Sequence, residues 1–107
     1  MVKRDKFTLL FAPEAIEHLD FIEPKHHTLL RRTVNEQLTY TPAEETRNRK
    51  PLEQPAPFDA TWELRCGHKN RIRVFYDVDL ESQTVEVLAI GTKDRNRLII
   101  GEVEYEL

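Results

Sequence analysis

TWELRCGHKNRIRVFYDV, from Thr61 to Val78, is the stretch that decides the fold. It reads as two strands joined by a short polar turn at residues 67–70. Because side chains leave a strand alternately to opposite faces, each strand has one apolar side and one cationic side. The hairpin therefore presents Arg65, Arg71 and Arg73 on a single surface when its register aligns them. A group of guanidinium ions on a rigid sheet is suited to binding phosphate or carboxylate.

Length and charge restrict the classes of protein to which the chain can belong. Its 107 residues predict a single domain, residues 1–107, with a modest two-layer core. The 16 Lys and Arg against 19 Asp and Glu give a net charge of −3, which argues against indiscriminate binding of nucleic acid. The charge is uneven, because residues 47–97 carry 10 basic and 8 acidic side chains, whereas residues 98–107 carry 3 acidic and no basic ones. A local cationic surface on an acidic protein is therefore expected.

The cysteine content and the N-terminal segment predict the compartment. A single cysteine excludes an internal disulfide, and Cys66 lies on the apolar side of its strand, where it is interpreted as a small buried hydrophobe. Residues 1–20 have too short an apolar core for a secretory signal, and no transmembrane span follows. The chain is therefore predicted to be cytoplasmic.

Hydrophobic spacing predicts two helices before the hairpin. Pro13 to Ile22 and Lys25 to Tyr40 both have apolar residues at helical intervals, and Leu30, Val34 and Leu38 form a stripe on the second helix. Pro24 ends the first helix, so the linker is very short. Two helices joined in this way should pack as a hairpin.

Strands are predicted on either side of these elements. Residues 6–12 form a short strand whose two sides are both apolar, which indicates a strand that is not freely exposed. Residues 83–91 form a β-branched central strand, and residues 98–107 form a further strand or an irregular tail. Strict alternation on the central strand places Val85, Val87 and Ala89 on one side, and Leu88 and Ile90 on the other.

The segment between the helices and the hairpin, residues 43–59, reads as an ordered loop with three prolines. A loop of this length in a small domain is often functional. Arg47, Arg49 and Lys50 either are ordinary solvated side chains or form a phosphate-contacting rim beside the hairpin.

Three histidines, His18, His26 and His27, fall in the helical region. The adjacent pair diverges by about 100° around a helix and so does not form the usual two-ligand metal pair. These histidines are interpreted as solvent-exposed helix residues, and no metal site is predicted.

The chain resembles the RelE/ParE superfamily, the toxins of bacterial type II toxin–antitoxin pairs. The residues that carry the resemblance run from Pro51-Leu52 through Trp62-Glu63-Leu64-Arg65 and Arg71-Ile72-Arg73-Val74-Phe75-Tyr76 to Ala89-Ile90-Gly91-Thr92-Lys93. The order of elements supports it: a strand, two helices, and three or more strands with cations after the last long one.

The resemblance implies an α+β fold of RelE-like order β-α-α-β-β-β, in which a small antiparallel sheet carries a two-helix hairpin on one face and cations on the other. The RelE branch of the family inhibits translation by cutting messenger RNA in the ribosomal A site. The ParE branch poisons DNA gyrase without hydrolysis. Both are neutralised by a cognate antitoxin protein, and the family uses no metal or organic cofactor.

Cleavage of RNA through the ribose 2′-hydroxyl needs a base, positive charge for the crowded phosphate, and an acid for the departing 5′-oxygen. Arginine supplies only the charge, because its pKa exceeds ~12. By resemblance, Arg73 matches the family's strand arginine and Lys93 falls where RelE-type enzymes carry another catalytic arginine. The proton-transfer candidates are Glu63, His68 and Lys93, and Tyr105 is a substitute if it folds back. The remaining cations assigned to RNA binding are Arg65, Arg71, Arg95, Lys50 and Lys69.

The chain departs from the family at the proton-transfer positions. Thr61 and Glu63 occupy the positions at which the family carries two lysines, and Ile99 occupies the position of the family tyrosine. One branch of the family uses a loop glutamate as its base, and this chain has Lys50 near that position. The first hypothesis is a ribosome-dependent messenger RNA endoribonuclease. The alternative is a ParE-like toxin that binds gyrase or another protein, or a member that has lost its chemistry.

The hairpin arginines have an alternative interpretation of their own, as ordinary cross-strand ion pairs on a solvated face. Trp62, Phe75 and Tyr76 are assigned to the core, although an exposed Phe75 on the arginine face would be able to stack on a base.

Overall fold

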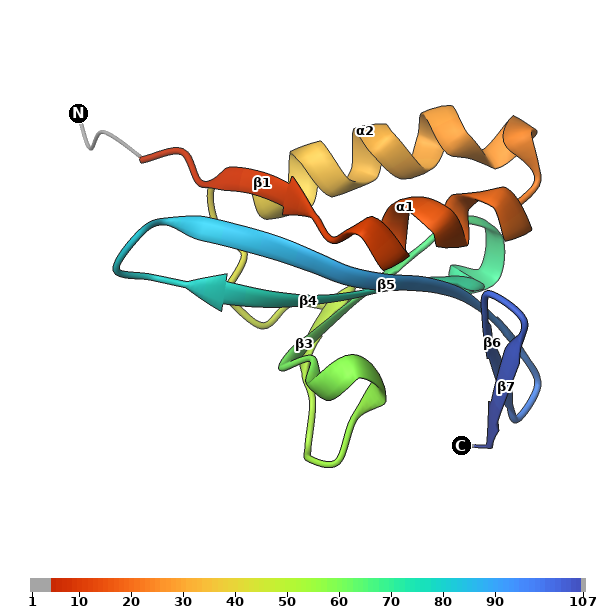
Figure 1. Ribbon diagram of the computed structural model, residues 1–107. Helices are drawn as coiled ribbons and strands as arrows, with labels where there is room; N and C mark the ends of the chain where they lie inside the picture. The colour runs from red at the N-terminus through yellow and green to blue at the C-terminus, as the bar shows by residue number, and fades with distance from the viewer. Residues whose placement is uncertain (1–4, 107) are drawn as a thin grey trace.

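Two helices cover one face of a twisted sheet in the computed structural model, which describes residues 5–106 (Figure 1). The first four residues of the N-terminal segment, in which the sequence predicts no secretory signal, lie outside that range. The elements in chain order are β1 (Thr8–Phe11), α1 (Pro13–His18), α2 (His27–Leu38), β2 (Arg49–Pro51), β3 (Trp62–Cys66), β4 (Ile72–Asp79), β5 (Thr84–Asp94), β6 (Arg97–Ile100) and β7 (Val103–Glu106). Single 3-10 turns occupy Leu19–Phe21, Pro24–His26, Pro57–Asp59 and His68–Asn70. Within residues 5–106 no helix has the length and apolar character needed to cross a membrane.

The sheet confirms the predicted fold class and adds strands that were not predicted. Strands β2 to β7 follow one another in spatial order, and every neighbouring pair is antiparallel. The segment predicted as a single strand or tail is the β6–β7 hairpin, and β2 lies inside the predicted loop. Strand β1 pairs with β5 in parallel. The prediction that β1 is shielded is wrong, because it lies at an edge where Leu10 is 51% exposed.

The main core lies between the helices and the sheet. The predicted stripe of α2 is confirmed, since Leu30, Val34 and Leu38 are all buried there. They pack against alternate residues of the sheet, and burial of each such side chain contributes about 1.5–3 kcal/mol. The sheet residues of this core are Leu64, Cys66, Ile72, Val74, Tyr76, Val85, Val87 and Ile90. The buried Tyr76 hydroxyl donates to the Pro42 carbonyl oxygen at 2.8 Å, and Cys66 is buried as predicted.

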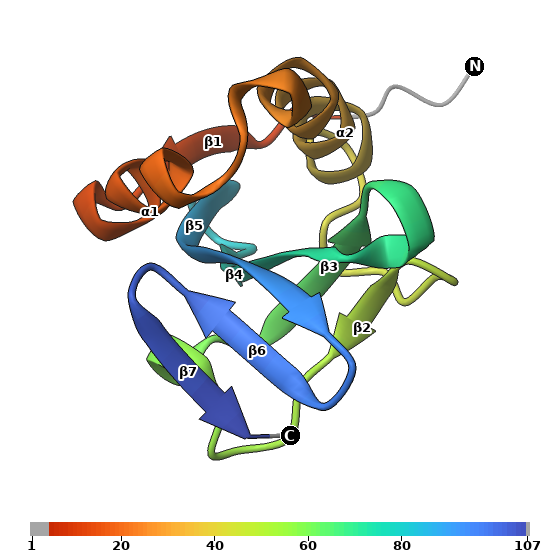
Figure 2. The same cartoon turned by 90° about the vertical axis from the view of Figure 1, so that its right-hand side faces the viewer.

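A second, smaller core covers part of the opposite face. Figure 2 shows the β6–β7 hairpin lying on the side of the sheet away from the helices. Its Leu98 and Ile100 pack with Ala60, Ala89 and Phe75. Phe75 is therefore 1% exposed, so its assignment to the core is confirmed and the stacking alternative is wrong. The cause is the β6–β7 hairpin, whose position the sequence pattern does not indicate.

His27, the first residue of α2, contacts the turn that follows the end of α1. The His27 Nε2–H donates to the carbonyl oxygens of Leu19 (3.0 Å) and Ile22 (2.8 Å), and the Leu19 oxygen also accepts from the Ile22 N–H at 3.1 Å. Helix α1 is shorter than predicted, and a 3-10 turn follows it. The prediction that the three histidines are solvent-exposed is wrong, because His18 is buried and both His26 and His27 are half-buried.

The loop before the hairpin is tied to α2 by a buried arginine. Arg49 is 6% exposed, donates from Nε to the Glu44 carbonyl oxygen at 3.1 Å, and also donates to the Gln37 carbonyl oxygen. A cation near the C-terminus of a helix is favourably placed for the helix dipole. Arg49 is therefore a structural residue, and the alternative that places it in a phosphate-contacting rim is wrong.

A β-bulge in β5 changes which side chains face the helices. Phe75 pairs with Ala89, but the next residue of β4, Tyr76, pairs with Val87, so Leu88 is an extra residue. Val85 and Val87 consequently face the helices together with Ile90. The predicted strict alternation along β5 is wrong beyond residue 88, and Ala89 lies on the opposite face.

His18 fills a gap between β1 and β6 at the edge of β5. Strand β1 pairs with residues 84–87 and β6 pairs with residues 91–94, so residues 88–90 have no strand beside them on that edge. The Ile90 N–H donates to Nδ1 of His18 at 3.2 Å, and Phe58 contacts the ring edge-on at a centroid distance of 5.4 Å. The ring thus replaces a strand partner.

We expect this arrangement to make stability depend on pH. Burial lowers the pKa of His18, although the nearby Glu17 and Glu14 partly oppose the shift. The folded protein therefore binds this proton less readily than the unfolded chain. The stabilisation is complete above the ordinary histidine pKa of 6.5 and is lost as pH falls from there through the lowered pKa of the folded state.

Urea unfolding measured at several pH values between about 8 and about 5 checks this prediction. His18→Asn places an amide oxygen where Nδ1 lies, so the variant is expected to keep the hydrogen bond and to show a shallower loss of stability on acidification. His68→Asn, at an exposed histidine, is the control and is expected to follow the wild-type curve. Identical pH curves for wild type and His18→Asn would contradict the prediction.

Candidate functional site: a cationic cleft

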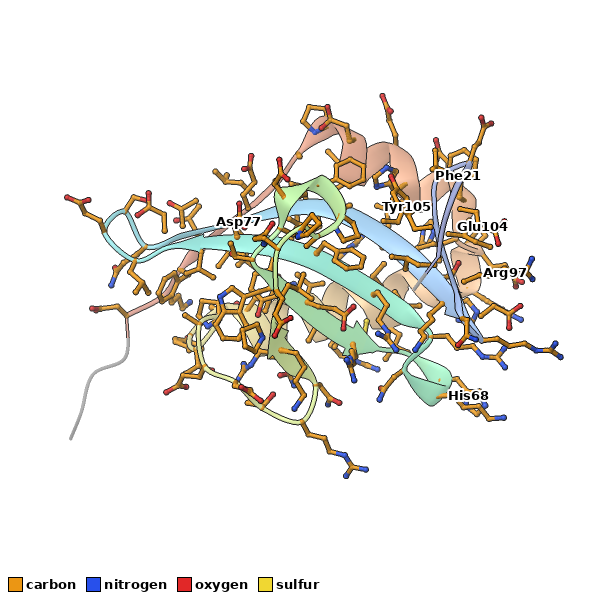
Figure 3. All side chains as sticks on the ribbon, turned by 90° about the horizontal axis from the view of Figure 1, so that it is seen from below. Phe21, His68, Asp77, Arg97, Glu104 and Tyr105 are labelled. Carbon is orange, nitrogen blue, oxygen red and sulfur yellow. The ribbon has the colours of Figure 1, made fainter. Side chains whose placement is uncertain are left out.

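A cleft of about 370 Å³ lies where the β3–β4 turn meets the end of β5. Five of its lining residues are basic and one is acidic, so the lining carries a formal charge of +4 on a protein whose net charge is −3. Figure 3 shows nitrogen-tipped side chains gathered at this end of the molecule, between the labelled His68 and Arg97. We call it the cationic cleft; its lining consists of Lys69, Asn70, Arg71, Arg73, Lys93, Asp94 and Arg95.

The β-bulge brings Lys93 into this cleft. Without the bulge, Lys93 would share a side with Val85 and Val87 and would face the helices. With the bulge, Gly91 pairs with Arg73, and residues directly opposite in a sheet share a face. Lys93 is two residues beyond Gly91 on β5, so it lies on the same side as Arg73. The Lys93 N–H donates to the Arg71 carbonyl oxygen at 2.7 Å, which fixes the end of β5 against the start of β4.

Arg65 and Arg73 share one face of the hairpin, as the sequence pattern predicts, and they lie directly opposite each other on it. Arg65 and Arg73 are cross-strand partners in the β3–β4 register. Both contact one oxygen of Glu63: Arg65 Nε lies 2.8 Å and Arg73 Nη1 lies 3.2 Å from Oε1. The cross-strand ion-pair alternative is thus correct for Arg73, whereas Arg65 pairs with Glu63 along its own strand. The pairs are not on a solvated face, however, because Glu63 and Arg73 are buried.

The other cleft cations are free of such pairing. Among the side chains that the structure describes, those of residues 5–105, no carboxylate oxygen lies within 4.0 Å of the side-chain nitrogens of Lys69, Arg71, Lys93 or Arg95. Arg71 is exposed and Lys93 is half-buried. These side chains are therefore available to an anion that enters the cleft, whereas Arg73 lies at its base.

Five of the predicted site residues lie outside the lining: Glu63 and Arg65, which pair with each other beside Arg73, and Lys50, His68 and Tyr105. Lys50 is opposite Glu63 on β2 and pairs with Glu45 at 3.4 Å. His68 is exposed in the 3-10 turn between β3 and β4, and Figure 3 shows it well separated from Tyr105 on the β6–β7 hairpin. Tyr105 packs against the second core. It is therefore not folded back over the arginines.

Two lining residues were not singled out from the sequence. Asn70 and Asp94 each adjoin a predicted cation in the chain, and that adjacency is the only signal for them. Asp94 lies 3.7 Å from Arg97, measured from Oδ2 to Nη2. It is the one carboxylate in the lining and hence a further proton acceptor beside the cleft.

Other features of the described structure do not offer comparable chemistry. Burial raises the pKa of the Cys66 thiol to about 11, so it is not a ready nucleophile. A cavity of about 710 Å³ beside the β4–β5 turn has Asp77, Asp79 and Glu86 in its wall and no basic residue. A third, of about 420 Å³, lies between α1 and α2 and is mainly apolar. The cationic cleft is thus the site suited to an anion.

The order of the elements and the packing of two helices on one face of the sheet define the fold as RelE-like α+β. The particular similarity is to a chain in the crystal structure of the toxin–antitoxin complex RelBE2 from Mycobacterium tuberculosis, with a TM-score of 0.67. The two chains are 24% identical, and the match covers 82% of this chain and 99% of that one. No protein-family model matches the chain, and no curated protein does. At this identity the similarity establishes the fold.

Proposed function

We propose that the chain is the toxin of a type II toxin–antitoxin pair and acts as a ribosome-dependent messenger RNA endoribonuclease. The observation that carries the proposal is the cationic cleft, with its free Arg71, Lys93 and Arg95, on a RelE-like fold. The similar structure is that of a toxin–antitoxin complex, which supports a cognate antitoxin as the partner. The proposed place of action is the cytoplasm, where ribosomes are.

In the proposed reaction, some residues supply positive charge and others transfer protons. Arg73, held at the base of the cleft, and Arg71 stabilise the pentacoordinate phosphate, because arginine remains charged at every relevant pH. Lys93 adds charge and is a candidate to move a proton. His68, in the same turn as Lys69, is the other candidate to move a proton. Arg65, Arg95, Lys69 and Lys50 extend the surface that contacts the RNA backbone.

A second candidate function is the binding of DNA gyrase or another protein without hydrolysis. The observation that favours it is the scarcity of proton-transfer groups in the cleft. Glu63 is engaged by two arginines, His68 lies outside the lining, and Asp94 is the one carboxylate within it. A cationic cleft with little acid or base is suited to binding an acidic surface.

One experiment separates the two functions. The purified protein is added to ribosomes programmed with a defined message, new 5′ ends are mapped, and gyrase supercoiling is assayed with the same preparation. New 5′ ends with normal supercoiling are expected. Inhibited supercoiling with intact message would favour the second function, and the absence of both effects would contradict both.

A further inference from the structure

Glu63 is a buried carboxylate surrounded by arginines. Its side chain is 10% exposed, and a single oxygen, Oε1, accepts from Arg65 Nε and Arg73 Nη1. Arg65 and Arg73 are directly opposite in the sheet, where like charges repel. The carboxylate offsets that repulsion, so the three groups together carry +1. It is the shared contact that allows two guanidinium groups to lie side by side at this depth.

Arg73 passes this constraint to the β3–β4 turn. Its Nε donates to the Asn70 carbonyl oxygen at 2.9 Å, so the Nη1 and Nε donors are both committed inside the protein. Lys69 and Asn70 have φ values of 54° and 55°, in the left-handed region that side-chain-bearing residues seldom adopt. Such a conformation persists where surrounding contacts hold it. The contact from Arg73 is one of them, and the turn it holds supplies one wall of the cationic cleft.

We propose that Glu63 is a positioning residue for the cationic cleft. Through Arg73 it fixes the orientation of the base of the cleft and the conformation of the turn that carries Lys69. This role differs from proton transfer, for which a carboxylate shared by two cations is poorly suited. The inference rests on the proposed function only in taking the bound anion to be an RNA phosphate.

The sign of one effect distinguishes positioning from simple electrostatics. Glu63→Gln removes a negative charge beside the cleft, and charge alone would then strengthen binding of an anion. Positioning predicts the reverse. We expect binding of a fluorescein-labelled oligouridylate of roughly 12 nucleotides, followed by anisotropy, to weaken about tenfold. Glu45→Gln, which removes a charge from an exposed carboxylate, is the matched control and is expected to bind as tightly as wild type or slightly more tightly.

A second readout does not depend on RNA. In nitrogen-15 spectra, the Nε–H signals of Arg65 and Arg73 are expected to exchange slowly with solvent in the wild type and at least about tenfold faster in Glu63→Gln. Glu63→Asp keeps the charge but shortens the side chain, so it is expected to show the same two losses. It decides the question if Glu63→Gln does not fold.

Tighter oligouridylate binding by a folded Glu63 variant, or unchanged Nε–H exchange, would overturn the positioning role. Failure of the wild type to bind oligouridylate would count against the proposed function instead. In that case the exchange measurement still decides the role of Glu63, because faster exchange in the variant supports it and unchanged exchange refutes it.

Discussion

Alanine at both Arg71 and Lys93 is expected to lower messenger cleavage on the ribosome by about 100-fold or more. Both side chains line the cationic cleft without a carboxylate partner within 4.0 Å in the described part of the chain, so their charge is free to act on a phosphate. Removal of one preorganised donor from an oxyanion site typically lowers the rate about 10²–10³-fold. Because neither side chain belongs to a core cluster, thermal unfolding of the double variant should be close to that of the wild type.

The matched control removes two positive charges elsewhere. Arg31 and Arg32 are exposed on α2, on the other side of the sheet from the cleft, so Arg31→Ala with Arg32→Ala lowers the net charge equally. We expect this control to cleave within about threefold of the wild type, since a general change of charge mainly affects the encounter. Equal losses in both double variants would show that net charge matters and the cleft does not. Full activity of the Arg71/Lys93 variant would remove the cleft from the mechanism.

Strict periodicity explains why the hairpin and the second helix could be predicted. Within each of the two strands of Thr61 to Val78 the alternation has period two, so the side that faces the helices and the cationic side follow from the chain alone. The four-residue intervals of Leu30, Val34 and Leu38 fix the buried face of α2 in the same way. These elements needed no information about their partners.

The composition of the cleft could be predicted only in part, because a bulge decides it. Alternation along β5 predicts that residues on the side of Val85 and Val87 continue on that side. The extra Leu88 reverses this, and Lys93 joins Arg73. A bulge depends on how two strands pair, and nothing in QTVEVLAIG marks the extra residue. The family resemblance identified Lys93 as a candidate catalytic residue, and the pairing of the strands explains its position in the cleft.

The surroundings of Glu63 and His18 also could not be predicted from the sequence. Each was given a solvent-facing or reactive interpretation from its residue type. In the structure Glu63 is shared by two arginines, and His18 takes the place of a strand partner for Ile90. Both arrangements join groups from different elements, and the second joins residues 72 positions apart. Such contacts depend on tertiary packing, which local pattern does not contain.

Gly91→Ala is expected to cause a large loss of stability, because β5 and β6 approach closely at this glycine. A Cβ at this position would lie 2.7 Å from the Ile99 carbonyl oxygen and 2.8 Å from Ile100 Cγ1. Because Ile99 contributes backbone, the conflict is relieved only if β6 moves away from β5. Overpacking of a tight interior costs about 1–3 kcal/mol, and the upper end of that range is expected for Gly91→Ala. For a domain of this size that lowers the thermal midpoint by roughly 10–20 °C.

The same displacement should reach the cationic cleft. Gly91 is opposite Arg73, and Lys93 is two residues further along β5, opposite Leu98 of β6. A shift of β6 therefore moves Lys93 and uncovers Phe75, so lowered cleavage is expected to accompany lowered stability even below the new midpoint. Thr92→Ala, at the neighbouring half-exposed position, is the control and is expected to change stability by less than about 1 kcal/mol. A wild-type midpoint for Gly91→Ala in thermal and urea unfolding would show that β5 and β6 do not meet in this register.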